Sequence, residues 1–262
     1  MGIKSFVNFG MFPKSNILLI SLLILSCSNS KERPLRIAAA SDLKFALDSI
    51  ARIFSENEKT PFPDITYGSS GKLFEQIRNG APFDLFFSAD ESLPEKLHIE
   101  KLTNGNPKLY GVGRLVIWSK KINPETEGIR SLMNPSLKKI SMANPIHAPY
   151  GKKAKEFLIN IEIWDSIQPK IVYGENISQA AQFLSTGAAD AGIIAFSIAK
   201  SESMQKLQGN YFLIPDSLHS PLRQSFVALL STEIHPKSVP FHNFVLSDTA
   251  QKILRFNGFS IP

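Results

Sequence analysis

The sequence predicts an α/β fold with mostly parallel strands and helices on both faces of the sheet. After Pro34, short apolar runs alternate with segments whose apolar residues recur at helical spacing. This alternation is typical of strand-helix-strand units, in which successive strands lie side by side. The 262 residues are 43% hydrophobic and 20% charged, which is enough for one or two domains with apolar cores.

The elements begin after a leader, and we expect residues 1–26 to be a signal peptide. Lys4 and Lys14 precede an apolar run over 17–25, and small residues follow this run. The run is about half of the roughly 20 residues that a membrane-spanning helix needs. We therefore expect an exported chain rather than one held by an uncleaved transmembrane helix.

Cys27 is the only cysteine, so the chain cannot form an internal disulfide. The stretch LILSC, which ends at Cys27, resembles a bacterial lipobox, where cleavage leaves the cysteine as a lipid-bearing first residue. An ordinary thiol is the alternative. The lipobox predicts a membrane-anchored lipoprotein that faces the periplasm or cell exterior, with residues 27–34 as the lipid-bearing tether.

The first half of the remaining chain contains three predicted strands, each followed by a helix. The strands are 35–39, 65–67 and 84–88, and the helices are 42–54, one that carries Leu73, Phe74 and Ile77, and 91–97. The second half repeats this pattern with different spacing. Its predicted strands are 115–118, 139–142, 171–173, 191–195, 211–214 and 224–230, with helices over 152–158, 178–184 and about 239–256.

Charge and motifs exclude several classes of function. Removing the leader, with two lysines and no acid, lowers the formal net charge from +6 to +4. Basic residues are scattered, so nucleic acid is not an expected partner. No histidine or cysteine spacing is typical of a metal site, and no cofactor is expected. Asp42, Asp84, Asp90 and Asp190 are expected to cap helices or to accept hydrogen bonds between elements.

Small or polar residues join a strand end to a helix start at four places. They are Ala40-Ser41-Asp42, Ser69-Ser70-Gly71, Pro149-Tyr150-Gly151 and Glu175-Asn176-Ile177-Ser178. Ligands of open α/β sheets bind at the carboxyl ends of strands, and free N–H groups at helix starts attract anions. Each place also has a simpler explanation: the serines and Asn176 could cap helices, and Tyr150 could serve packing alone.

The stretch ITYGSSGKL around Ser70 does not match two known motifs. A leucine follows Gly71-Lys72 where the nucleotide-binding loop requires Ser or Thr. The order Gly68-Ser69-Ser70-Gly71 also differs from the G-x-S-x-G of a hydrolase elbow. A serine hydrolase that uses Ser70 with a histidine base is a less favoured alternative.

Three motifs at these spacings together resemble the periplasmic molybdate-binding proteins of ATP-binding-cassette importers. They are AAASDL from Ala38, YGSSGKL from Tyr67 and GAPFDLFFSAD from Gly80, and the likeness extends over 35–262. The resemblance implies a two-lobed type II periplasmic binding protein fold, with a mixed, mostly parallel sheet in each lobe and two crossover strands. Lobe 1 would comprise 35–112 and 221–262, and lobe 2 would comprise 113–220.

The same resemblance implies the site and its partners. Ser41 and Ser70 would give hydroxyl and amide donors, and Tyr150 and Ile177 would give backbone amides. The ligand would be molybdate or tungstate, whose metal atom is contacted only through the oxygens of the oxyanion. No residue would ligate a metal cation. The protein would be a monomer that delivers its anion to an ABC permease and is not an enzyme.

One position departs from the family pattern. Family members often carry a tyrosine whose hydroxyl donates to the anion, and Ala195 stands at that position here. Either Tyr150 compensates or one hydrogen bond is absent. A site with donors only suits molybdate, tungstate or sulfate, so a sulfate binder is an alternative, as is a surface lipoprotein with an idle cleft.

Overall fold

The computed structural model describes residues 1–2, 33–230 and 234–261. The chain divides into two units, Met1–Arg33 and Pro34–Pro262, and the second unit contains all helices and strands described here. Cys27, the predicted signal peptide beyond Gly2 and most of the predicted tether lie outside the described residues. Within the described part of the chain, no helix has the length and apolar character needed to cross a bilayer.

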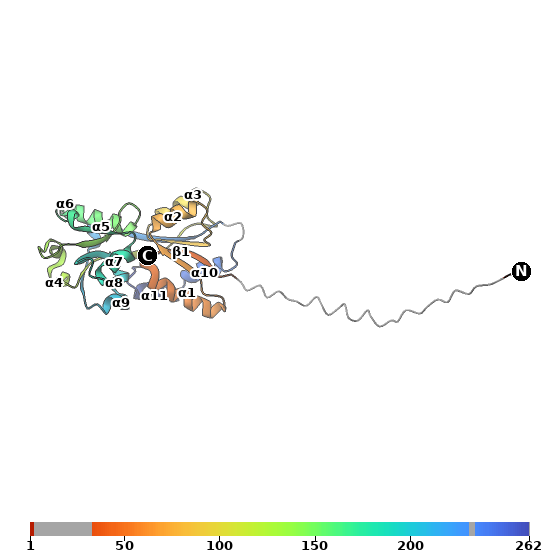
Figure 1. Cartoon of the computed structure of the whole chain (residues 1–262). Coiled ribbons are helices and arrows are strands. Elements are labelled where there is room, and N and C mark those ends of the chain that lie inside the picture. Colours follow the sequence, from red (N-terminus) through yellow and green to blue (C-terminus); the bar gives the residue numbers. More distant parts are fainter. Residues whose placement is uncertain (3–32, 231–233, 262) are drawn as a thin grey trace. The chain divides into compact units, whose positions relative to one another are not determined.

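The first of two five-stranded sheets has the strand order β2-β1-β3-β10-β4. β10 is antiparallel to both of its neighbours, so the other four strands run in one direction. Figure 1 shows helices on both sides of this sheet. The strands are β1 Arg36–Ala40, β2 Asp64–Gly68, β3 Leu85–Ser88, β4 Lys108–Gly113 and β10 Leu222–Ala228, and the helices are α1 Lys44–Glu58, α2 Ser70–Arg78, α3 Ser92–Ile99, α10 Ser238–Val245 and α11 Asp248–Phe256.

Alternating side chains of the central strands fill two separate cores. Ile37 and Phe87 pack with apolar residues of α1, α10 and α11. Ala38 and Phe86 pack on the opposite face with residues of α2 and α3. Because successive side chains of a strand point to opposite faces, the buried runs of β1 and β3 serve both cores.

The second sheet has the order β7-β6-β8-β5-β9, and again one strand, β5, is antiparallel to both neighbours. Its side chains and the surrounding helices form a single core. The strands are β5 Leu115–Ser119, β6 Ile140–Ala143, β7 Ile171–Gly174, β8 Ala191–Ala195 and β9 Asn210–Leu213, and the helices are α4 Pro124–Glu127, α5 Pro149–Asn160, α6 Trp164–Ile167, α7 Ile177–Ser185, α8 Phe196–Ala199 and α9 Glu202–Gln205. The short 3-10 helices are η1 Ser41–Leu43, η2 Gly128–Met133, η3 Gln168–Lys170 and η4 Asp216–Leu218.

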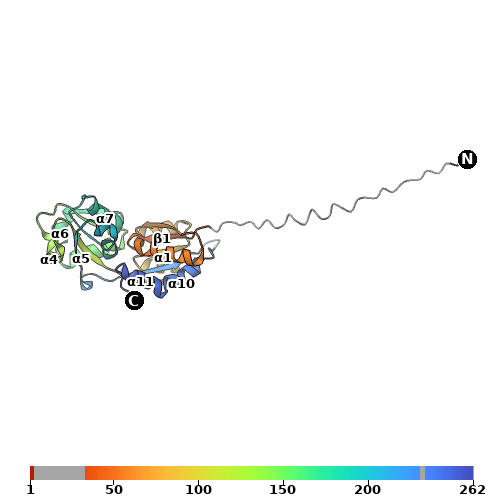
Figure 2. The same ribbon diagram turned by 90° about the horizontal axis from the view of Figure 1, so that it is seen from below.

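The chain passes between the two sheets twice, at Arg114 and between β9 and β10. We call the parts that carry the first sheet lobe 1 and the part that carries the second sheet lobe 2 (Figure 2). The predicted lobe boundaries, 112/113 and 220/221, remain a proposal about how the molecule divides.

Two predicted helices differ from the structure. The helix expected over about 239–256 is two helices, because the chain turns at Leu246 and Ser247, where the Ser247 hydroxyl accepts from the amide of Ala250 (3.4 Å) and caps α11. The helix expected to begin at Lys152 begins at Pro149. Proline is favoured in the first helical turn, where its missing N–H costs nothing.

Candidate anion-binding site

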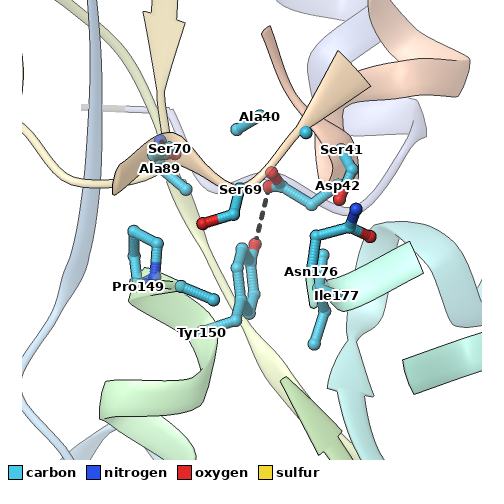
Figure 3. A pocket seen from close by; sticks show the side chains of 12 residues that line it. Ala40, Ser41, Asp42, Ser69, Ser70, Ala89, Pro149, Tyr150, Asn176 and Ile177 are labelled. Carbon is cyan, nitrogen blue, oxygen red and sulfur yellow. Dashed lines mark hydrogen bonds between the residues drawn. The ribbon is translucent and has the colours of Figure 1, made fainter. Parts of the chain in front are cut away.

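A small cavity lies where the strand ends of the two lobes meet. All four residues predicted from the sequence line it: Ser41 and Ser70 from lobe 1, and Tyr150 and Ile177 from lobe 2 (Figure 3). The remaining lining residues are Ala40, Asp42, Gly68, Ser69, Ala89, Ala148, Pro149 and Asn176. The lining contains no lysine, arginine or histidine.

The hydroxyls of Ser41 and Ser70 each accept a hydrogen bond from a backbone amide. Ser41 Oγ accepts from the amide of Ser178 (3.4 Å), and Ser70 Oγ accepts from the amide of Ala89 (3.0 Å). A hydroxyl that accepts such a bond keeps its own hydrogen for donation. Both serines are buried and line the cavity, and neither hydroxyl donates to another described residue, so their hydrogens are available to a molecule inside the cavity.

The simpler explanation of these serines as helix caps is not what the structure shows. Ser69 is the N-cap residue of α2, yet its side chain makes no capping bond and instead donates to the carbonyl of His147 in lobe 2 (2.5 Å). Ala40, not Ser41, is the N-cap residue of η1. Asn176 does cap, since its side chain accepts from the amide of Gln179 (3.0 Å).

Lobe 2 presents the starts of α5 and α7 to the cavity. Tyr150 is the second residue of α5 and Ile177 is the first residue of α7. Amides in the first turn of a helix have no carbonyl four residues before them to bond, and the helix dipole makes this end partly positive. These two amides can therefore donate to an anion without a cationic side chain.

Asp42 is a further cavity residue, and sequence reasoning assigned it no ligand. Asp42 Oδ2 accepts from the hydroxyl of Tyr150 and from Gln224 Nε2, both at 2.9 Å. Gln224 Oε1 in turn accepts from the hydroxyl of Tyr110 (2.6 Å). Burial raises the pKa of the Asp42 carboxyl to about 6, although hydrogen bonds from Gln224 and Tyr150 oppose the rise. The only sequence signal for Asp42 was its position directly after Ser41.

The tyrosine hydroxyl expected from the family pattern has no replacement in this structure. Ala195 ends β8, is fully buried and has no donor in its side chain. The Tyr150 hydroxyl donates to Asp42, so it does not compensate for Ala195.

Contacts between the lobes close the cavity on several sides. The carbonyl of His147 accepts from the amide of Gly71 (3.0 Å) as well as from Ser69, and the Ser197 hydroxyl donates to the carbonyl of Asp42 (2.8 Å). Lys72 forms a half-exposed ion pair with Glu175 of lobe 2 (3.3 Å).

The geometry does not support the hydrolase alternative. His147, whose carbonyl contacts Ser69 and Gly71, places its ring nitrogen Nε2 3.0 Å from the carbonyl of Glu175. Across the described ranges, no histidine ring is hydrogen-bonded to Ser70, and no group of three or more His, Cys, Asp or Glu residues could hold a metal ion.

A family model described as "Bacterial extracellular solute-binding protein" matches residues 35–260. The chain belongs to this family. Among relatives of this solute-binding protein, a molybdate-binding protein of Azotobacter vinelandii is 31% identical over 240 residues, which cover 91% of this chain and 94% of the relative. A molybdate-binding protein of Rhodobacter capsulatus is 32% identical over 225 residues, covering 85% of this chain and 86% of the relative.

A further relative is a putative ABC transporter substrate-binding lipoprotein of Bacillus subtilis, 28% identical over 95% of this chain and 99% of the relative. Among solved structures, the periplasmic molybdate-binding protein of Azotobacter vinelandii aligns with a TM-score of 0.78 and 29% identity over 87% of the present solute-binding protein and 99% of that chain. The predicted fold class is therefore confirmed. A sulfate-binding protein of Mycobacterium tuberculosis has a TM-score of 0.71 at 15% identity, which shows the fold alone.

Proposed function

We propose that this solute-binding protein captures molybdate or tungstate in the cavity between its lobes and delivers it to an ABC importer. The observation that carries the proposal is the lining of the cavity, which offers hydroxyl and helix-start amide donors and no cationic side chain. Such neutral donors suit a fully ionised tetrahedral oxyanion. The names of the Azotobacter and Rhodobacter relatives support molybdate over other anions.

In the proposed complex, Ser41 and Ser70 donate from lobe 1 and the amides of Tyr150 and Ile177 donate from lobe 2. The bound metal is held only through its oxygens, so no residue ligates the metal itself. The protein acts as a monomeric carrier without a cofactor or a catalytic residue.

Calorimetric titration with molybdate, tungstate, sulfate and phosphate tests this function. Hydrogen bonds to a charged group contribute about 1.5–3 kcal/mol, so Ser70→Ala should weaken molybdate binding by roughly tenfold to a hundredfold. Ser185→Ala, which removes an exposed hydroxyl at the end of α7, should leave the affinity unchanged. If the parent and Ser70→Ala bind molybdate with equal affinity, Ser70 does not contact the anion. If the parent binds sulfate more tightly than molybdate, the protein is a sulfate carrier.

We further propose that the mature chain begins at Cys27, carries lipid there and stays at a membrane surface after export. The lipobox-like sequence and the name of the Bacillus relative support this anchoring. One acyl chain binds a membrane only marginally, so stable anchoring requires two or three. Mass spectrometry of the protein from its own cells should find an acylated N-terminal cysteine, and an intact Met1 or cleavage beyond Cys27 would refute the anchor.

A further inference from the structure

One buried oxygen at the cavity has no hydrogen-bond partner. Asp42 lines the cavity and is 1% exposed, and no described donor meets hydrogen-bond geometry at its Oδ1, although the nearby backbone amides of Asp42 and Leu43 act on the carboxyl and lower its pKa. Figure 3 shows the carboxyl directly beyond the hydroxyl of Tyr150, among the residues that line the pocket. A buried polar atom without a partner is costly, so a bound molecule that pairs with this oxygen would gain the bond.

The charge of a carboxylate at this position opposes the binding of an anion. The side chains that hydrogen-bond to Asp42 are Tyr150 from α5, Gln224 from β10 and, at its backbone carbonyl, Ser197 from α8, and Tyr110 from β4 lies behind Gln224. None of them carries a positive charge, and burial raises the pKa of both phenols well above the usual value, so they stay neutral. An ionised Asp42 and an oxyanion would therefore repel each other in a cavity with little water to screen them.

We propose that Asp42 binds the oxyanion as the neutral carboxylic acid, with Oδ1–H donating to an oxygen of the anion. This inference rests on the proposed function and adds a fifth residue to its site. The proton comes from solvent and stays on the carboxyl, so no covalent bond to the anion forms or breaks. Oδ2 keeps the bonds from Tyr150 and Gln224, because a protonated carboxyl still accepts at its other oxygen. The acid thereby supplies a side-chain donor that Ala195 lacks.

Binding is then linked to the uptake of one proton. In the free protein Asp42 loses its proton near pH 6, and a bound dianion would favour the protonated form further. Affinity for molybdate should be nearly constant below about pH 6 and should fall by about tenfold for each pH unit above it, reaching roughly a hundredfold at pH 8. Calorimetry in buffers of different ionisation enthalpy should find about one proton taken up per anion at pH 8 and about half a proton at pH 6.

The Asp42→Asn variant keeps a hydrogen-bond donor at position 42 but cannot take up or release a proton in this pH range. Asparagine offers an N–H where the acid offers an O–H, and its carbonyl can still accept from Tyr150. Its affinity should stay within severalfold of the parent's value at pH 6 and should not change between pH 6 and pH 8. Asp48→Asn makes the same chemical change on the surface of α1, where Asp48 pairs with Lys44, and should keep the parent's slope.

The outcomes distinguish this inference from the function on which it rests. Binding of molybdate by the parent with no proton uptake and no pH slope would overturn the acid form of Asp42 and leave the carrier function intact. Tighter binding of hydrogen phosphate than of molybdate at pH 8 would also overturn it, because an ionised Asp42 would then accept the phosphate hydrogen. The absence of any heat with molybdate, tungstate or sulfate would overturn both proposals. The proton count needs only the parent protein, so it decides the question even if Asp42→Asn does not fold.

Discussion

Gly71 stands where α2 of lobe 1 meets the loop before α5 of lobe 2, and the two backbones touch there. A Cβ atom on Gly71 would lie 2.5 Å from the carbonyl oxygen of His147, the atom to which the Gly71 amide donates. Such a distance is too short for carbon and oxygen, so the backbones would have to separate. Glycine at this position therefore allows the lobes to approach.

We expect Gly71→Ala to weaken molybdate binding by about tenfold or more, since a loss of about 1.4 kcal/mol in closure alone has this effect. The ligand-free protein should keep its unfolding temperature within a few degrees, because alanine is favoured over glycine inside a helix. Titration calorimetry and thermal unfolding measure the two quantities. Glu75→Ala, an exposed change on the same helix, is the matched control, and unchanged affinity in Gly71→Ala would show that this contact is not needed for binding.

The sequence could not predict in which direction each of two neighbouring side chains points. Ser69 and Ser70 are identical in chemistry and adjacent, yet Ser69 donates across to lobe 2 and only Ser70 keeps its hydrogen for the cavity. The motif placed both at the strand end, but the direction of each hydroxyl depends on where α2 begins. Asp42 was expected to accept hydrogen bonds between elements, which it does, whereas its unpartnered second oxygen depends on packing across the lobes.

Among the elements, the helices that start at strand ends could be predicted because their signals lie in neighbouring residues of the sequence. Buried strands and amphipathic helices have periods of two and 3.6 residues, and the turns between them contain small residues. β4 has a weaker signal and was missed, since two glycines interrupt the apolar residues of KLYGVG and its pairing partner, β10, is more than a hundred residues away. The break between α10 and α11 was missed for a similar reason, as apolar residues continue on both sides of Ser247.

Asp190 connects three segments of lobe 2 just before β8. Its carboxylate accepts from Lys121 Nζ (2.8 Å) and from the amides of Lys138 (2.7 Å) and Lys139 (3.0 Å), the residues that precede β6. Partial burial favours the neutral acid, but these hydrogen bonds outweigh it and lower the pKa from 3.8 to about 2. This matches the expectation that Asp190 accepts hydrogen bonds between elements.

Asp190→Ala should lower the free energy of unfolding at pH 7 by about 1.5–3 kcal/mol, because two amides lose a charged acceptor. The folded state has the lower pKa, so the contribution is fully present above about pH 4 and is lost as the pH falls towards 2. Urea unfolding at pH 7 and pH 2.5 measures it, and the gap between parent and variant should narrow at the lower pH. Asp165→Ala, which removes an exposed carboxylate from the same lobe, is the control. An equal loss of unfolding free energy in Asp165→Ala would show that the hydrogen bonds of Asp190 do not stabilise the fold.

At the scale of the whole molecule, the two lobes are joined by two short crossings and meet at the cavity. The crossings at Arg114 and between β9 and β10 lie beside Val112-Gly113 and Leu218-Pro221, and we expect the hinges at these two places. The cavity lining comes from both lobes, so separation of the lobes would widen the way into the cavity.

We expect the free protein to populate an open form and the anion to shift it towards the closed one, since the anion contacts both lobes only when they are closed. X-ray scattering should give a smaller radius of gyration with saturating molybdate than without it. Ser70→Ala at the same molybdate concentration should respond less, in proportion to its weaker binding. Identical scattering curves for the parent with and without molybdate would exclude hinge closure as the response to the ligand.

The place of β10 in the first sheet has a consequence for how the chain acquires its shape during synthesis. β10 lies between β3 and β4 and is the strand through which β4 joins this sheet. The ribosome makes Leu222–Ala228 only after every strand of the second sheet, so the sheet of lobe 1 stays incomplete until lobe 2 has been synthesised. All strands of the second sheet lie within 115–213, so lobe 2 can assemble earlier. Pairing between distant segments is slow, so the sheet of lobe 1 should be completed later than the sheet of lobe 2.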